Sequence, residues 1–362
     1  MKVNERKPMI SVFKNLKIDG ILTDIISENG VISIVDKVDR DGVDFHGMKG
    51  YAGLIDIHTH GMKGMDTMDG NIGGMAKLYA ESGTTTFYPT TMTASNEKLK
   101  DVLVLPEEKD GAKAPGFHME GPYISPDHCG AQNGMYVRSP DISEFAALKN
   151  VKLITVAPEL EGAMEFIRDC GCVVCLGHTD SDYAVGMQAA RAGAKCLTHM
   201  FNAMPPLHHR EPALIGAAFD SDMYVQVICD GKHIHPSVIR MVYKLFGPDR
   251  MILISDSMRA AGLPDGIYEF GGLETEVRNN TARTAAGALA GSTSTLFECV
   301  KCAVEFGIPE KDAFIMASRT PARLMGLNSG ELLPGKDCDM IIVNERNEID
   351  TVIIDGQIRF CK

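Results

Sequence analysis

Leu54-Ile55-Asp56-Ile57-His58-Thr59-His60-Gly61 is the stretch of sequence that decides the fold. An apolar run leads directly into two histidines separated by one residue, which is typical of a buried barrel strand that delivers ligands into a pocket. Because side chains alternate along a strand, His58 and His60 point the same way, and two imidazoles on one face can bind one metal ion. Taken alone, the pair is also compatible with a polar strand end that binds no metal. Residues elsewhere in the chain distinguish the two interpretations.

Composition excludes several classes of partner. The chain has 362 residues, of which 44% are hydrophobic and 23% charged, and its formal net charge is -12. No run rich in lysine and arginine stands out, so we expect neither nucleic acid nor a membrane as partner. No apolar run approaches the roughly 20 residues that span a bilayer, and residues 1–6 lack the apolar core of a signal peptide. We therefore expect a cytoplasmic protein.

The ten cysteines are expected to be reduced. They are scattered through apolar segments, as buried free thiols are. Two Cys-x-x-Cys pairs, Cys172/Cys175 and Cys299/Cys302, lie far apart in the chain. The first pair falls in a strand pattern that turns its side chains to opposite faces, so we do not expect zinc knuckles.

Both ends of the chain read as β structure. Residues 1–52 and 331–362 alternate short apolar runs with turn signals, among them Asn29-Gly30 and Asp355-Gly356. An Asn-Gly pair between apolar runs is a strong hairpin signal. We expect the two ends to form one small β-sandwich domain beside a central domain of residues 53–330.

The central domain alternates apolar strands with helical segments. Helical patterns occupy, for example, residues 73–82, 162–170 and 183–193. The eight candidate strands are residues 54–58, 84–90, 116–120, 152–157, 172–178, 195–199, 224–230 and 251–256. Eight strands with helical crossovers predict an α/β fold, a (β/α)8 TIM barrel. A doubly wound open sheet is the alternative, but no glycine-rich nucleotide loop follows the first strand.

Polar residues gather where these strands end, which in a barrel is the face that carries the active site. The residues are His58, His60, Glu120, His178, His199 and Asp256. Such ligands suit one or two divalent metal ions, zinc first, with iron, cobalt or manganese as alternatives. Glu120 would bridge a metal held by the two later histidines and a second held by the first-strand pair. Asp256 is expected to act as general base and then as general acid.

Longer motifs surround these residues. They are Gly53 to Gly61, His118-Met119-Glu120-Gly121-Pro122, Gly177-His178-Thr179, Thr198 to Met204, His209-Arg210-Glu211-Pro212, Asp230-Gly231-Lys232-His233, Ser255 to Gly262, Ala288 to Ser292 and Leu333 to Asp339. With them the chain resembles the amidohydrolase superfamily and, within it, the family of N-acetylglucosamine-6-phosphate deacetylases. Phe-Asn-Ala-Met followed by Arg-Glu-Pro is the specific part, and the motifs span nearly the whole chain.

The resemblance implies an enzyme that hydrolyses a linear amide, releasing acetate and glucosamine 6-phosphate from N-acetylglucosamine 6-phosphate. It implies that Glu120, His178 and His199 hold the principal metal and that Asp256 is catalytic. It also implies a homodimer in which an arginine of one subunit binds the substrate phosphate in the active site of the other subunit. The implied phosphate contacts are Asn202, Ala203, Arg210 and His233, with Arg210 as the residue that crosses the interface.

Other positions follow from the same resemblance. Leu289, Ala290 and Gly291 are implied to line the sugar pocket. Gln132 stands where many members have a histidine that contacts the substrate near its acetamide; a glutamine amide can donate a hydrogen bond but carries no charge.

Three alternatives stay open. The site fits a deacetylase for the galactosamine epimer, or a deaminase or cyclic amidase of the same superfamily. A non-catalytic barrel scaffold is a third reading, although it leaves the retained polar groups unexplained. Occupancy of the His58/His60 site is open as well.

Overall fold

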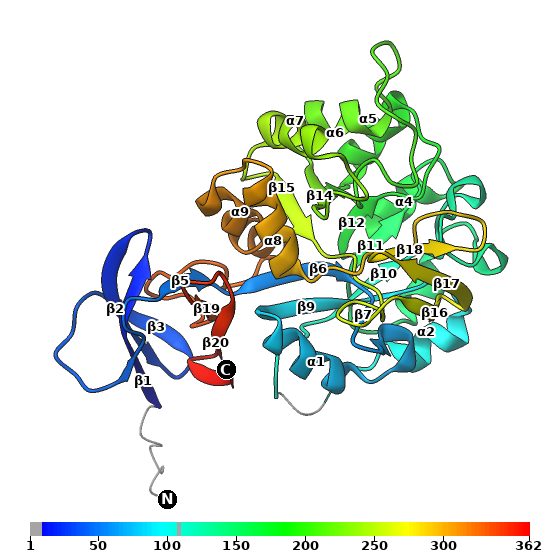
Figure 1. The fold of residues 1–362 in the computed structure, drawn as a ribbon. Coiled ribbons are helices and arrows are strands. Elements are labelled where there is room, and N and C mark those ends of the chain that lie inside the picture. The colour runs from blue at the N-terminus through cyan, green and yellow to red at the C-terminus, as the bar shows by residue number, and fades with distance from the viewer. Residues whose placement is uncertain (1–8, 107–109) are drawn as a thin grey trace, which may run out of the picture.

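The computed structural model describes residues 9–106 and 110–362. Residues 1–8 lie outside the described residues. They include the first part of the predicted β domain and the segment that lacks the apolar core of a signal peptide. Figure 1 shows a barrel and, beside it, a separate sheet that contains strands from both ends of the chain. The predicted α/β barrel with a β unit from the chain ends is therefore confirmed.

The barrel is a path of eight parallel strands in the order β15-β14-β13-β12-β11-β10-β9-β6. Its ends approach each other where the Asp256 N–H donates to the carbonyl of His58 at 2.9 Å, so the barrel is nearly closed. All eight predicted strands are present. They are β6 (Leu54–Thr59), β9 (Thr84–Thr91), β10 (Phe117–Glu120), β11 (Val151–Val156), β12 (Val173–Leu176), β13 (Cys196–Leu197), β14 (Tyr224–Ile228) and β15 (Met251–Ile254).

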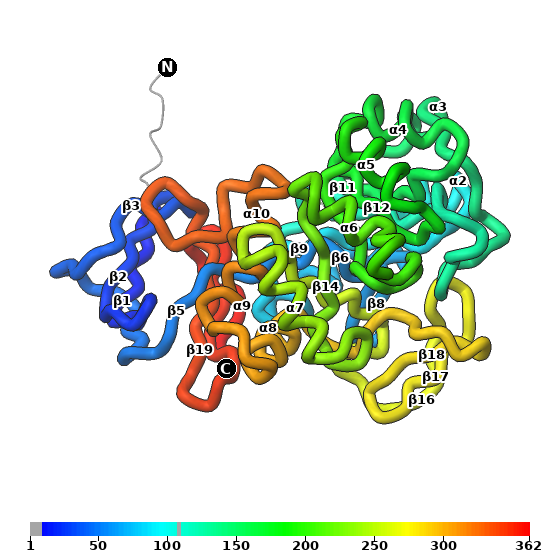
Figure 2. The backbone as a smooth tube through the Cα atoms, turned by 90° about the horizontal axis from the view of Figure 1, so that it is seen from above, coloured from blue at the N-terminus to red at the C-terminus, as the bar shows by residue number. Residues whose placement is uncertain are grey.

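A helix follows every barrel strand, and Figure 2 shows several of these helices around the strands. The three helical patterns named from the sequence coincide with α1, α4 and α5. In chain order the helices are α1 (Ile72–Glu81), α2 (Asn96–Val102), α3 (Ile142–Ala146), α4 (Ala163–Asp169), α5 (Tyr183–Ala192), α6 (Ala213–Asp220), α7 (Pro236–Phe246) and α8 (Leu296–Glu305). Among residues 9–106 and 110–362, none is long and apolar enough to cross a membrane.

Helix α7 illustrates why these segments are helical. His235 caps its start by accepting the Ser237 N–H, and proline occupies the first helical position, where its missing N–H costs nothing. The buried side chains Ile239, Val242 and Phe246 recur three and four residues apart and form one apolar stripe. This stripe packs the helix against the barrel, and the exposed residues of the helix include Arg240 and Lys244 as well as Met241 and Leu245.

The amino-terminal end of the barrel is closed by apolar packing. After α9 (Glu310–Met316), helix α10 (Arg319–Met325) places Ala322, Leu324 and Met325 against a cluster of buried strand residues that includes Ile55 and Ile254. With this end filled, the carboxyl end is left for polar chemistry, as in other barrels.

The end sheet runs in the order β21-β20-β19-β5-β1-β2-β3, with the short β4 beside β1. Its turn at Asn29-Gly30 has positive φ at both residues, as the Asn-Gly signal predicts. We propose domain boundaries at 52/53 and 330/331, because β5 belongs to this sheet and β6 to the barrel. The strands are β1 (Ile10–Ile18), β2 (Ile21–Glu28), β3 (Val31–Val35), β4 (Val43–Asp44), β5 (Lys49–Ala52), β19 (Met340–Val343), β20 (Ile349–Ile354) and β21 (Gln357–Cys361).

Two small sheets lie at the mouth of the barrel. A hairpin follows β6, with β7 (Gly61–Met62) and β8 (Met65–Asp66), and a three-stranded sheet follows β15, with β16 (Gly266–Phe270), β17 (Leu273–Arg278) and β18 (Thr281–Thr284). The three-stranded sheet is not among the elements predicted from the sequence. Its turns nevertheless carry a signal, because Gly271-Gly272 and Asn279-Asn280 all adopt positive φ, as tight hairpin turns require.

Candidate metal centre and active site

Six predicted ligands from five barrel strands meet at the carboxyl end of the barrel. The most exposed of them retains 7% of its accessible surface, so this is a buried cluster of charged and polar groups. Their positions are His58 in β6 and His60 just after it, Glu120 at the end of β10, His178 after β12, His199 after β13 and Asp256 after β15.

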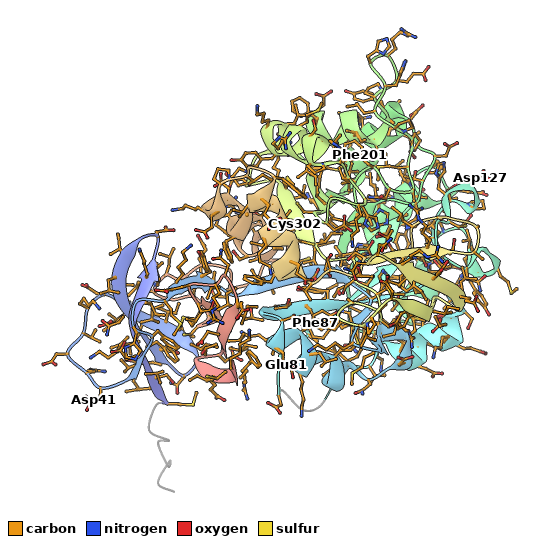
Figure 3. The ribbon with its side chains drawn as sticks, in the orientation of Figure 1. Asp41, Glu81, Phe87, Asp127, Phe201 and Cys302 are labelled. Atoms are coloured by element: carbon orange, nitrogen blue, oxygen red, sulfur yellow. The ribbon has the colours of Figure 1, made fainter. Side chains whose placement is uncertain are left out.

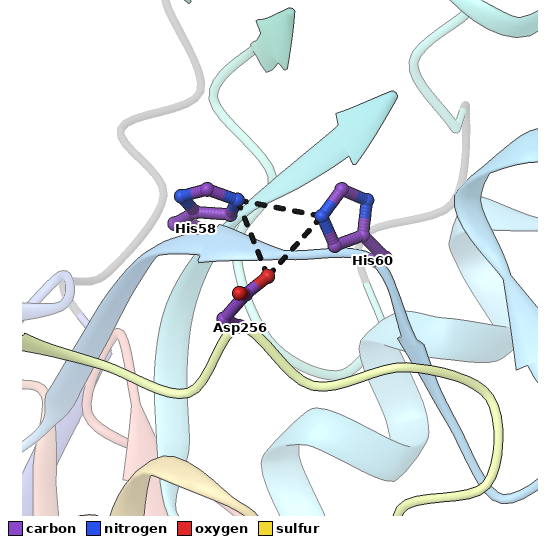
Figure 4. A group of neighbouring side chains, drawn as sticks. All are labelled: His58, His60 and Asp256. Atoms are coloured by element: carbon purple, nitrogen blue, oxygen red, sulfur yellow. Dashed lines mark hydrogen bonds and ion pairs between the residues drawn. The ribbon is translucent and has the colours of Figure 1, made fainter. Parts of the chain in front are cut away.

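His58, His60 and Asp256 form one group that could hold a metal ion. The two Nε2 atoms lie 3.3 Å apart, and each lies 3.3 Å from Oδ1 of Asp256. Figure 4 shows the three side chains pointing toward a common centre. The two histidines thus share a face, as the strand alternation predicts.

Glu120, His178 and His199 form a second such group. Oε1 of Glu120 lies 3.3 Å from Nε2 of His178 and 3.0 Å from Nε2 of His199. The same carboxylate reaches the first group, with Oε1 3.2 Å from Nε2 of His58 and Oε2 3.3 Å from Nε2 of His60. Glu120 therefore lies between the two groups, the position that a bridging ligand requires.

Three of the four imidazoles are oriented by oxygen atoms behind them. An oxygen acceptor requires a proton on Nδ1, so in the neutral ring Nε2 keeps its lone pair for a ligand bond. The pairs are His58 Nδ1 with Oε1 of Gln226 at 3.0 Å, His60 Nδ1 with the carbonyl of Thr90 at 3.1 Å, and His178 Nδ1 with the carbonyl of His128 at 2.8 Å. Sequence reasoning missed these partners, because they come from other strands and loops and carry no local signal.

The carboxylates and the first-strand histidines shift each other's pKa values. Burial alone would lower the pKa of His60, but hydrogen bonds with Asp256 and Glu120 outweigh it and raise the pKa to about 10. Burial would raise the pKa of Glu120, yet the charge of His58 and the close imidazoles of His178 and His199 hold it well below its usual range. The pKa of Asp256 is likewise lowered, against the effect of burial, by His58 and His60. Both carboxylates are therefore anionic.

This donor set fits a divalent cation. Imidazole nitrogen and carboxylate oxygen are the ligands that zinc and neighbouring transition metals prefer. Oε1 of Glu120 is buried without a hydrogen-bond partner among the described residues, although three Nε2 atoms lie within 3.3 Å of it. A cation would satisfy this oxygen and displace protons from the imidazoles, which is how metal sites normally form.

The backbone at the ligands is strained. His178, His199 and Asp256 have φ values of 49°, 25° and 45°, in or near the left-handed region that non-glycine residues avoid. Such conformations cost about 1–3 kcal/mol each and persist where the surrounding structure enforces them, which occurs often at functional sites. Here the positive φ values direct the side chains of His178, His199 and Asp256 toward the centre of the barrel mouth.

A pocket of about 400 Å³ opens onto this cluster. Most of the residues expected to bind substrate line it, namely Gln132, Asn202, Ala203, His233, Leu289 and Gly291. Ala290 is fully buried and does not line the pocket. Arg210 does not line it either: it lies exposed on the segment between β13 and α6, where its guanidinium contacts the ring of His209 at 2.6 Å.

Both ends of the Gln132 amide are engaged by the protein. Its oxygen accepts the Thr93 N–H at 2.7 Å, and its nitrogen donates to Oε2 of Glu120 at 2.5 Å. Gln132 therefore lines the pocket and at the same time fixes the carboxylate that joins the two ligand groups.

His233 is held by a partner that sequence reasoning did not single out. Nδ1 of His233 donates to Oδ2 of Asp230 at 2.8 Å, and its backbone N–H donates to Oδ1 at 2.9 Å. Both side chains are at least 95% buried. The spacing Asp-Gly-Lys-His is a local signal for this pair, and the contact leaves Nε2 of His233 for the pocket that this residue lines.

Several lining residues were also not predicted. Asp127 and Phe201, labelled in Figure 3, lie on the segments that follow β10 and β13. Phe270 comes from β16 of the inserted sheet and meets the His60 ring edge-on, with centroids 5.0 Å apart. The inserted sheet thus contributes an apolar wall beside the first ligand group.

Comparison with known proteins gives concordant matches. The amidohydrolase family matches residues 51–359. An N-acetylglucosamine-6-phosphate deacetylase of Bacillus subtilis (strain 168) is 39% identical over 331 residues, which are 85% of this chain and 84% of that protein. An N-acetylgalactosamine-6-phosphate deacetylase of Escherichia coli O157:H7 is 34% identical over 324 residues, 84% and 86% of the two chains. The crystal structure of N-acetylglucosamine-6-phosphate deacetylase from Pasteurella multocida superposes with a TM-score of 0.91 at 28% identity, covering 98% of this chain and 100% of that chain.

Proposed function

The chain belongs to the amidohydrolase family, and from this membership we propose that it is a metal-dependent deacetylase of N-acetylglucosamine 6-phosphate. The reaction consumes water and yields glucosamine 6-phosphate and acetate. The observation that carries the proposal is the pair of metal-type ligand groups joined by Glu120 at the base of a 400 Å³ pocket. Relatives with this reaction in their names match most of the chain.

Each ligand group has a proposed place in the reaction. Glu120, His178 and His199 would hold the principal ion, zinc in our proposal, and His58 and His60 with Asp256 a second one. A bound divalent cation supplies Lewis acidity, which polarises a carbonyl and lowers the pKa of water.

Asp256 is the proposed proton carrier. Its carboxylate is anionic and faces the cluster, so it can accept a proton from the water that attacks the amide carbon. As the C–N bond breaks, Asp256 returns this proton to the sugar nitrogen, which leaves as the amine. A C–O bond has formed, a C–N bond has broken, and the carboxylate is restored.

The substrate is proposed to lie across the pocket. Asn202, Ala203 and His233 would hold the phosphate, with Asp230 keeping the imidazole of His233 turned for this contact. The segment Leu289 to Gly291 would flank the sugar. Gln132 lies within hydrogen-bond distance of Glu120, so we place the acetamide beside it, at the metal-type ligands.

Arg210 is proposed to complete the phosphate site of a second subunit in a homodimer, because it is exposed and lies outside the pocket of its own chain. Replacing Arg210 by alanine is expected to raise KM for the phosphorylated substrate about 10- to 100-fold, which corresponds to a lost charge-assisted hydrogen bond of about 1.5–3 kcal/mol. KM for unphosphorylated N-acetylglucosamine should not change. Steady-state kinetics on both sugars tests this.

Arg191→Ala is the matched control, because Arg191 is also an exposed arginine and lies on α5. It should leave both constants unchanged. Equal effects of Arg210→Ala on the two sugars would remove Arg210 from the phosphate site.

The function itself is tested by acetate release from N-acetylglucosamine 6-phosphate before and after exhaustive chelation. We expect acetate only with metal present, one to two metal equivalents per chain before chelation, and recovery when zinc is restored. Full activity in a metal-free protein would refute metal catalysis. Absence of acetate release from either sugar would instead favour a deaminase, a cyclic amidase or a non-catalytic scaffold.

The galactosamine epimer is a second candidate substrate, favoured by the E. coli relative named for it. Running N-acetylgalactosamine 6-phosphate in the same assay ranks the two by kcat/KM. We propose that the glucosamine substrate is preferred.

We also propose that the protein acts in the cytoplasm. Its free cysteines are compatible with that reducing compartment.

A further inference from the structure

Cys170 and Cys172 form a thiol pair remote from the proposed reaction. Cys170 follows the end of α4, Cys172 precedes β12, and Gly171 lies between them. Their Sγ atoms are 3.6 Å apart, with the Cys172 thiol directed at the sulfur of Cys170. A disulfide needs about 2.05 Å, so the two sulfur atoms already face each other and need a small further approach.

Gly171 explains this arrangement and leaves it accessible. Its φ of +72° bends the chain through the left-handed region, which brings the residues on both sides of it together. Apart from its two chain neighbours, no residue has an atom within 4 Å of the position that a Cβ would occupy there, and Gly171 is exposed. A depression of about 360 Å³, lined by Gly171, Cys172 and Lys152, adjoins it.

The two thiols differ in acidity. The hydrogen bond from Cys172 outweighs the effect of burial and lowers the pKa of Cys170 to about 7, while the same bond raises the pKa of Cys172. The contact therefore favours the thiolate at Cys170, which is the reactive form in disulfide exchange. By contrast, Cys175, Cys196 and Cys299 are completely buried.

We propose that Cys170 and Cys172 are a redox modification site that exchanges with low-molecular-weight disulfides of the glutathione type. The thiolate of Cys170 attacks one sulfur of the oxidant, forms a mixed disulfide and releases one thiolate. Cys172 then loses its proton and attacks the sulfur of Cys170, which closes the internal disulfide and releases the second thiolate. The oxidant gains the two electrons that the protein thiols give up.

This site is independent of the proposed hydrolysis. The pair lies at the amino-terminal end of β12, whereas His178 follows the carboxyl end of the same strand. None of the contacts described for the metal-type ligands involves either cysteine, so failure of one proposal leaves the other standing.

The test uses the folded full-length protein and oxidised glutathione at neutral pH. Remaining thiols are alkylated under denaturing conditions, and the peptide that carries both cysteines is weighed by mass spectrometry. This tryptic peptide, residues 169–191, also contains Cys175. We expect it to lose two hydrogen masses, to carry one alkyl group, on Cys175, and to carry three alkyl groups after treatment with dithiothreitol. Alkyl groups on Cys170 and Cys172 without reduction, or a persistent glutathione adduct, would overturn the proposal.

Variants and a second pair sharpen the assay. Cys172→Ser is expected to stop at the glutathione adduct on Cys170, and lack of this adduct would remove Cys170 as the attacking thiol. Cys299 and Cys302 on α8 are the internal control, because Cys299 is buried; Cys302 is labelled in Figure 3. Both cysteines should be fully alkylated without prior reduction, because they do not react with oxidised glutathione in the folded protein. Circular dichroism and basal acetate release confirm that the variants are folded.

Discussion

Replacing Asp256 by asparagine is expected to lower kcat about 10²- to 10⁴-fold, the range that a general acid–base group contributes. The asparagine side chain has the same shape and keeps one oxygen toward His58 and His60, but it cannot accept the proton of the attacking water. Metal on Glu120, His178 and His199 should remain, because Asp256 is not part of that group. Steady-state acetate release and metal analysis on the same sample measure both effects.

Two results separate this role from a structural one. KM should change much less than kcat, because no substrate-binding contact is removed. Asp230→Asn is the matched comparison, since Asp230 is also a buried carboxylate at the mouth of the barrel, but one that orients His233. It should act mainly on KM for the phosphorylated substrate. Near-normal turnover in Asp256→Asn would exclude Asp256 as the proton carrier.

Replacing Glu120 by glutamine is expected to have a comparable or larger effect through loss of metal. Glu120 lies within 3.3 Å of all four imidazoles, so its negative charge serves both ligand groups. Without it we expect less than one metal equivalent per chain and a fall in kcat/KM of more than about 10³-fold, equivalent to about 4 kcal/mol of transition-state stabilisation.

Glu97→Gln on α2 removes an exposed carboxylate of the same kind and should change neither metal content nor activity. Metal analysis of Glu120→Gln after dialysis distinguishes the possible outcomes. A variant that retains two equivalents would show that Glu120 does not bridge. A variant that retains metal and activity would place the reaction elsewhere in the pocket.

The two glutamines around the site bear on how many ions it holds. Gln226 orients His58 from behind, and Gln132 fixes Glu120 on the side facing His60. One contact orients a ligand of the group formed by His58, His60 and Asp256, and the other orients the carboxylate of the group formed with His178 and His199. This arrangement is compatible with the upper value of the expected one to two equivalents.

Much of the fold and of the site was predictable because the signals are local. Apolar runs with helical stretches between them identify all eight barrel strands, and strand alternation predicts that His58 and His60 share a face. In a parallel barrel, residues that follow different strands meet at one end, so the set of candidate ligands could be predicted from the sequence. The Asn29-Gly30 turn follows from backbone conformation alone.

What orients and surrounds these ligands was decided by tertiary structure. Gln226 and Thr90 reach the histidines from other strands, and no spacing in the sequence reports such a contact. The inserted sheet that brings Phe270 against His60 depends on how hairpins pack after they form. Arg210 illustrates the same limit, because its distance from its own pocket depends on the path of an exposed segment.

The sequence by itself thus determined the barrel, the six residues at its mouth and the family. Tertiary structure decided that Glu120 lies between two ligand groups, that Gln132 and Asp230 hold their neighbours, and that Cys170 faces Cys172. The physical reason is the distance along the chain over which each effect acts. Strand period, turn conformation and residue chemistry act over a few neighbours in the chain, whereas the partner of a buried polar atom is chosen by packing among elements that are distant in sequence.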